Sequence, residues 1–167
     1  MPIKRILIPV DFSADSLKAL AYARDFAKPF GAELCVLYVV EPIYYATPAD
    51  MYATSPNIAM LIDEQQRVGA QQLARINADL KKRGATVRTL QKTGSAAQSI
   101  VDTAKTLKAD LIIMGTHGRT GFAHMLMGSV AEKVVRTAGC PVLTVRPEAA
   151  KKAARKQQAK PAPTRRS

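Results

Sequence analysis

The glycines that follow one apolar run are the residues of this chain best suited to hold an anion. The apolar stretch Leu111–Met114 ends in Gly115 and Gly118, and nine residues separate Gly118 from Gly128 and Ser129. Glycine permits positive φ and a close approach of the backbone to a ligand. A helical pattern begins at Ser129, and a helix start presents free N–H groups and a partial positive charge. This order of strand, glycine-rich loop and helix start predicts a phosphate site. The alternative is a loop whose glycines only shape turns.

Two further residues of the loop could act on a bound phosphate. Arg119 supplies a positive charge, but it could equally be a solvated loop residue. His117 lies between the motif glycines, where an orienting hydrogen bond within the loop is favoured over a catalytic or phosphate-accepting role. Ser129 can donate its hydroxyl and N–H groups to a phosphate, or it merely caps the last helix.

Apolar runs that alternate with helical patterns must position these residues. Strands are predicted over residues 3–10, 33–40, 86–91, 110–114 and 141–145, with a helix between each consecutive pair. Continuous apolar strands indicate burial on both faces, so the pattern predicts an α/β domain with a parallel sheet between helices. Ligands of such sheets bind outside the carboxyl ends, where the strand order reverses. The first and fourth strands have unusual endings, at Pro9–Asp11 and at Met114–Gly115. We therefore expect the ligand to bind between these two strands.

Several local signals define the predicted helices. Ser13 is a good N-cap for the first helix, and Ser95 with Gln98 forms a capping-box pattern for the third. Gly84 ends the long second helix. One face of that helix is predicted to be apolar, through Ile58, Leu61, Ile62, Val68, Leu73, Ile76 and Leu80. The strand over residues 86–91 alternates in polarity and is predicted near a sheet edge. The segment 43–57 is either a lid or a loop that packs its tyrosines on the domain.

Length, composition and charge exclude some classes of protein. The 167 residues suit one domain with an ordinary core, and no apolar run is long enough to span a bilayer. The net charge of +12 is uneven, because residues 148–167 carry seven basic side chains and one acidic one. We expect this basic tail to be disordered or only partly helical. It could contact nucleic acid or an acidic surface, but a solubilising tail is favoured since no aromatic residue is available for base stacking.

The cysteines and histidines give little support for a metal site. Cys35 and Cys140 lack metal-ligand spacing and are expected to be free thiols, which fits a cytoplasmic setting. His117 and His124 have no carboxylate nearby in sequence.

Residues 2 to about 147 resemble the universal stress protein family. The resemblance is carried by 4–13 (KRILIPVDFS), 109–119 (ADLIIMGTHGR), 128–131 (GSVA) and 140–145 (CPVLTV). It implies one doubly wound, Rossmann-like domain over residues 1–147, of the adenine nucleotide alpha hydrolase type. Its five-stranded parallel sheet would have the order 3-2-1-4-5 and helices on both faces.

The glycine motif is similar to that of the ATP-binding branch of this family. The resemblance implies that ATP, with or without Mg²⁺, is held by Pro9, Val10, Asp11, Val39, Met114, Gly115, His117, Gly118, Arg119, Gly128, Ser129 and Val130. Asp11 would accept ribose hydroxyls or hold Mg²⁺ through water, and its alternative role is to cap the first helix with Ser13. Val39 would read adenine through main-chain groups. Family members commonly form homodimers through the last strand, here Val142, Leu143, Thr144 and Val145.

The resemblance favours a nucleotide-loaded regulator of the stress response over an enzyme. The chain lacks the Gly-x-x-x-x-Gly-Lys-Ser/Thr loop of P-loop ATPases, and no catalytic triad or carboxylate pair stands out. Two alternatives remain. One is a slow ATPase or autophosphorylating enzyme, and the other is a nucleic-acid or membrane-surface adaptor that works through the tail.

Overall fold

The chain folds into a parallel sheet between two layers of helices. The structure, a computed structural model, describes residues 2–42, 56–117 and 127–146. Its five strands have the order β3-β2-β1-β4-β5, and all four pairings are parallel. The predicted fold class and strand order are therefore confirmed. In chain order the elements are β1 (Arg5–Val10), α1 (Ala14–Ala27), η1 (Lys28–Phe30), β2 (Glu33–Val40), α2 (Pro56–Lys82), β3 (Val87–Thr93), α3 (Ala96–Leu107), β4 (Leu111–Gly115), α4 (Ser129–Thr137) and β5 (Val142–Val145).

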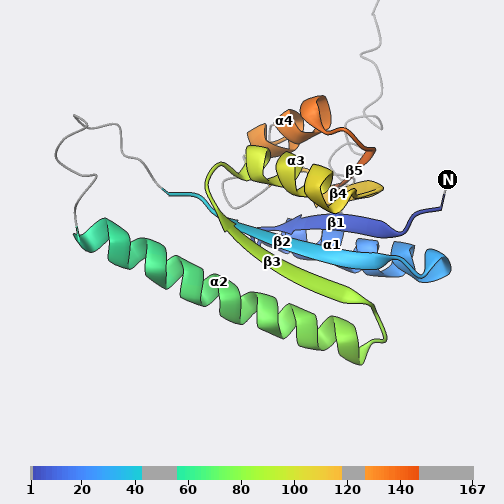
Figure 1. The fold of residues 1–167 in the computed structure, drawn as a ribbon, viewed down its shortest axis with the longest axis horizontal. Coiled ribbons are helices and arrows are strands. Elements are labelled where there is room, and N and C mark those ends of the chain that lie inside the picture. The colour runs from blue at the N-terminus through green and yellow to red at the C-terminus, as the bar shows by residue number, and fades with distance from the viewer. Residues whose placement is uncertain (1, 43–55, 118–126, 147–167) are drawn as a thin grey trace, which may run out of the picture.

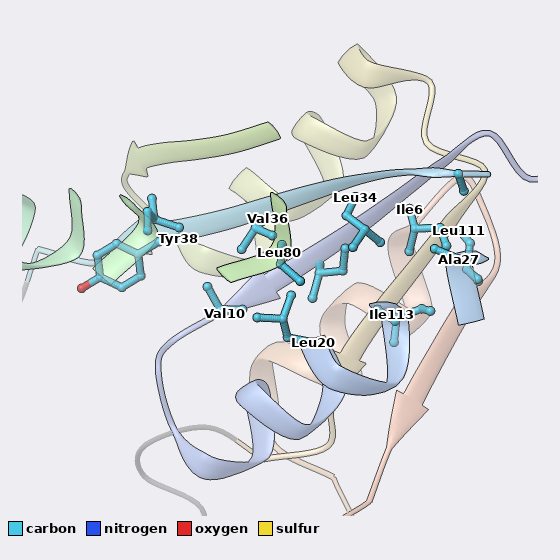
Figure 2. Close-up of a cluster of buried hydrophobic side chains, with 14 of the residues drawn as sticks. Ile6, Val10, Leu20, Ala27, Leu34, Val36, Tyr38, Leu80, Leu111 and Ile113 are labelled. Carbon is cyan, nitrogen blue, oxygen red and sulfur yellow. The ribbon is translucent and has the colours of Figure 1, made fainter. Parts of the chain in front are cut away.

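Each face of the sheet has its own apolar cluster. Alternate residues of a strand point to opposite faces, so Ile6, Ile8 and Val10 of β1 pack under α1 and α2, whereas Leu7 packs under α3 and α4. Figure 1 shows α3 and α4 together on one side of the sheet and α2 along the other. Figure 2 shows the cluster beneath α1 and α2, with Tyr38 at its margin. Burial on both faces explains the continuous apolar strands.

The helix boundaries confirm most of the local signals. Ser13 is the N-cap of α1, and its side chain accepts a hydrogen bond from the N–H of Ser16. The first helix ends at Ala27, and Gly31 with φ +61° closes the short turn that follows it. Gly84 has φ +78° just beyond α2 and donates its N–H to the carbonyl of Lys81.

The apolar residues predicted to share one face of α2 differ in burial along the helix. Leu73 and Leu80 are buried, and Ile62 and Ile76 pack against the same cluster, but Leu61 and Val68 are exposed. The first turns of α2 extend past the carboxyl ends of the strands in Figure 1. No sheet therefore lies beneath Leu61 to bury it, although its helical spacing matches that of the buried residues.

The outer strands lie where the sequence placed them. β3 occupies one edge, which confirms the prediction for the alternating strand, and β5 occupies the other. The basic tail and most of the segment 43–57 lie outside the described residues. Within the described ranges, no helix has both the length and the apolar character needed to cross a membrane.

Candidate functional site

The strands β1 and β4 stop pairing early, and Pro9 explains why. They pair only at Ile6–Leu111 and Leu7–Ile112, while β1 continues to pair with β2 as far as Val10. Arg5 points its carbonyl toward β4, where it accepts a hydrogen bond from Asp110 N at 3.0 Å. Backbone groups alternate between the two neighbouring strands, so Pro9 also faces β4, and proline has no N–H to donate. We call this divergence of β1 and β4 the switch point.

The loop after β1 is held by a compact hydrogen-bond network. The Oδ1 atom of Asp11 accepts hydrogen bonds from the N–H of Ser13 at 3.0 Å and from its hydroxyl at 2.6 Å. The Ser16 hydroxyl in turn donates to the Ser13 carbonyl at 3.0 Å. The structure therefore places Asp11 in the cap of α1, the alternative that the sequence left open. This network fixes the carboxylate at the carboxyl edge of β1, beside the switch point.

The end of β4 packs tightly between α1 and α4. A Cβ atom on Gly115 would lie 3.2 Å from the Asp15 carbonyl carbon, so glycine lets β4 pass close to the first turn of α1. Thr116 is 1% exposed, and its hydroxyl lies 3.0 Å from Nδ1 of His117. The N–H of Gly128 donates to the Thr116 carbonyl at 2.8 Å. This bond joins the start of α4 to the end of β4.

The helix α4 begins with backbone amides rather than with a side-chain cap. Gly128 is the N-cap residue in an extended conformation, and no side chain of the described residues caps this helix. Ser129 and Val130 form the first turn, where N–H groups have no partner within the helix. The helix dipole adds a partial positive charge at this end. The chemistry of this helix start suits a phosphate or another anion.

The predicted site residues meet at this edge from three strands and one helix. Pro9, Val10 and Asp11 end β1, Val39 lies near the end of β2, and Met114 to His117 end β4. The side chains of Val10 and Met114 are buried in the two apolar clusters, and Val39 packs against the second. Val10 and Met114 can then contact a ligand at the edge mainly through main-chain groups, whereas Val39 is only partly buried. Gly118 and Arg119 lie outside the described residues.

Glu41 is a residue of this edge that the sequence did not single out. Its Oε1 accepts a hydrogen bond from the N–H of Ala96 at 2.6 Å, at the start of α3. The predicted capping box is wrong, because the Ser95 side chain makes no cap and the Gln98 side chain donates to Asp102 instead. A carboxylate from the end of a neighbouring strand replaces the local cap. A sequence pattern within one helix cannot reveal such a partner.

A cleft of about 340 Å³ opens beside this edge, between the start of α1 and the helix α2. The residues that line it come from the loop after β1, from β2 and from α2, and they are Asp11, Phe12, Ser13, Tyr38, Glu64, Gln65, Val68 and Gln72. Asp11 is the one predicted site residue among them. The α2 residues gave no signal in the sequence beyond the apolar spacing of Val68.

Acidic and metal-binding groups do not gather at this site. Among residues 2–42, 56–117 and 127–146, no group of three His, Cys, Asp or Glu side chains has the arrangement of a metal site. Cys35 and Cys140 are free thiols, and burial is the largest cause that raises the pKa of each.

Comparison with known proteins identifies related chains. A family model described as the universal stress protein family matches residues 2–146. A universal stress protein of Methanocaldococcus jannaschii is 39% identical over 144 residues, which cover 86% of this chain and 82% of that protein. The solved structure of a universal stress protein from Lactobacillus plantarum has a TM-score of 0.78 at 28% identity, over 87% of this chain and 99% of the other. A universal stress protein solved in complex with cAMP has a TM-score of 0.61 at 25% identity, over 87% and 98% of the two chains.

Proposed function

The chain belongs to the universal stress protein family, and from this premise we propose that it binds ATP at the switch point, with or without Mg²⁺. The nucleotide would act as a bound effector that changes the partner or shape of a cytoplasmic stress-response regulator. The solved relative in complex with cAMP supports an adenine nucleotide as the ligand class.

One observation carries this proposal: the start of α4 is joined to the end of β4 directly beside the switch point. The Gly128 N–H bond to the Thr116 carbonyl, at 2.8 Å, sets this junction. The uncapped first turn of α4 then offers its N–H groups and its dipole to the phosphates. The glycine motif supports the same assignment, since Gly118 and Arg119 come between these two elements in the sequence.

The remaining site residues divide between the base and the ribose. Val39 would offer its main-chain groups to adenine, because its side chain packs into the second cluster. Asp11 would accept a ribose hydroxyl or orient a water on Mg²⁺, and its bonds to Ser13 fix its carboxylate for that role. Pro9, Val10, Met114 and Gly115 would line the site mainly through their backbones.

The experiment is a calorimetric titration of the full chain with ATP and Mg²⁺. Ser129→Ala removes one hydroxyl and should weaken ATP binding by about tenfold, or about 1.4 kcal/mol. Gly128→Val should weaken it further, because a Cβ there lies 3.3 Å from the Thr116 carbonyl oxygen. Gly139→Val is the matched control, since a Cβ at Gly139 meets nothing within 4 Å. No heat with the unmodified chain at millimolar ATP would exclude the proposal.

We also propose that the domain comprises residues 1–147 and that residues 148–167 form a separate basic tail. The family model, which ends at residue 146, and the end of β5 at Val145 support this boundary. A homodimer through β5 is the proposed assembly, and β5 lies at a sheet edge as that assembly requires.

A further inference from the structure

Two locally unfavourable features lie in or beside the cleft between α1 and α2. The first is Phe12, a bulky residue with φ +63°. Residues other than glycine rarely adopt this left-handed conformation, and it persists only where the surroundings enforce it. The Phe12 ring lies 4.6 Å from the ring of Tyr38, centroid to centroid, and both residues line the cleft. The strained backbone thus holds an aromatic side chain at the cleft.

The second feature is Gly69, which lies against the cleft residue Tyr38. Tyr38 is 6% exposed in a strand whose other buried residues are aliphatic or Cys35, and Figure 2 shows its hydroxyl pointing away from the aliphatic cluster. A Cβ on Gly69 would lie only 2.3 Å from Cε1 of Tyr38. Gly69 therefore stays a glycine inside a 27-residue helix, although glycine there is less favourable than alanine by about 1 kcal/mol. Positions that break local rules together are commonly functional.

The polar groups of the cleft define the ligand that it can accept. Asp11 and Glu64 contribute carboxylates, while Gln65 and Gln72 contribute amides. Arg67 pairs with Glu64 at 2.7 Å and lowers its pKa through this hydrogen bond, so Glu64 is ionised at neutral pH. Arg67 does not line the cleft, but it donates to both carboxylate oxygens of Glu64, at 2.8 and 2.7 Å, and balances its charge. The Asp11 carboxylate accepts hydrogen bonds and repels anions, which favours a ligand with N–H or O–H donors and no negative charge.

We propose that this cleft is a second binding site, separate from the switch point, for a small molecule with a flat ring and N–H or O–H donors but no anionic group. The aromatic side chains of Phe12 and Tyr38 contact the ring, and the Asp11 carboxylate and the amides bind the donors. A volume of about 340 Å³ falls within the usual range for small-molecule sites. Asp11 belongs to both sites, so a ligand in the cleft would compete with the ribose of ATP for this one carboxylate.

Adenosine is a suitable probe, because it has a flat ring, an amine and hydroxyls but no phosphate. We expect adenosine to shift the amide NMR signals of Gly69 and its neighbours in α2. Val68→Arg should weaken this binding by about tenfold or more, because it places a long cationic side chain over the cleft. Val68 is 41% exposed, so the substitution leaves the core intact. Val135→Arg is the matched control on α4, where Val135 is 44% exposed, and it should change nothing.

The outcomes separate this site from the proposed ATP site. Two results would overturn the second site and leave the ATP proposal standing. In one, adenosine binds the Val68→Arg protein as tightly as it binds the unmodified chain. In the other, adenosine shifts only the amide signals of residues 114–117 and 128–130. Absence of any adenosine binding also overturns it. If ATP does not bind but adenosine still shifts the amide signal of Gly69, the ATP proposal is overturned and the proposed cleft site stands. We expect ATP to bind the Val68→Arg protein normally.

Discussion

Asp110 joins the starts of β1 and β4 through backbone amides. Its Oδ2 accepts hydrogen bonds from the N–H groups of Lys4 at 2.8 Å and Arg5 at 2.9 Å. These two bonds are the largest causes that lower the pKa of Asp110. The carboxylate thus replaces strand pairing at the point where the chain enters the sheet.

Asp110→Ala should lower the free energy of unfolding by about 1 kcal/mol, since the group is partly solvated. A carboxyl whose pKa is lowered by folding stabilises the fold above its unfolded pKa of about 3.9, and this stabilisation is lost as the pH falls through the folded pKa. Urea unfolding between pH 7 and pH 3 tests both effects. The unmodified chain should lose more stability on acidification than Asp110→Ala. Equal losses in the two proteins would contradict this role.

The close packing of Gly69 against Tyr38 can also be tested with a single substitution. Gly69→Ala should destabilise the protein by about 1–3 kcal/mol, because its Cβ overlaps the Tyr38 ring. The sign is opposite to that expected for alanine in a helix interior. The double variant Gly69→Ala with Tyr38→Leu should relieve the overlap and show clear non-additivity. Thermal unfolding measures all three proteins, and a stabilised Gly69→Ala protein would show that α2 shifts freely.

The serines that precede α1 and α3 differ in whether their side chains cap the helix. Ser13 accepts a hydrogen bond from Ser16 N at 3.3 Å, whereas the Ser95 side chain makes no cap and Glu41 binds the Ala96 N–H instead. Ser13→Ala should therefore reduce stability by about 1 kcal/mol. Ser95→Ala should change it by only a few tenths. Hydrogen exchange at the first turns of α1 and α3 measures each effect locally. Equal losses for the two variants would refute the assignment of Glu41 as the cap.

The elements that the sequence predicted well are those fixed by local chemistry. Both ends of β2 agree with the prediction, since Glu33 precedes an uninterrupted apolar run that ends at Val40. The start of α1 also agrees, because Ser13 bonds within its own turn. The cap of α3 was missed since Glu41 is distant in sequence, and the exposure of Leu61 depends on where the sheet ends.

The same distinction applies to the candidate site. The strand endings and the start of α4 could be predicted, because glycine, proline and N-cap residues indicate them directly. The cleft could not, because it depends on where α2 crosses the sheet over Tyr38. The roles of Gly118 and Arg119 stay predictions, because both lie outside the described residues.

At the scale of the whole molecule, the free edge of β5 determines the proposed assembly. Pro141 and Val145 offer their carbonyls to β4, at 3.0 Å from Ile112 N and 3.2 Å from Thr116 N. Backbone direction alternates along a strand, so the N–H groups of Val142 and Thr144 point away from the sheet. A second copy could pair with them.

Thr144→Pro removes one outward N–H and leaves the bonds to β4 intact. If β5 joins two copies, light scattering should show the molar mass of a dimer for the unmodified chain and of a monomer for Thr144→Pro, with little loss of thermal stability. Leu143→Pro is the matched control, because its N–H faces β4 and its loss should destabilise the fold itself. A monomer in the unmodified chain at micromolar concentration would contradict the dimer.

Pro9 has a consequence for how fast a nucleotide could enter. The strands β1 and β4 separate because Pro9 has no backbone N–H to donate, which is a property of its covalent structure. The two main chains are therefore already apart in the free protein, and no binding free energy is needed to part them. Separation of these two strands is therefore not a step that precedes association, and it should not limit the rate at which a nucleotide binds.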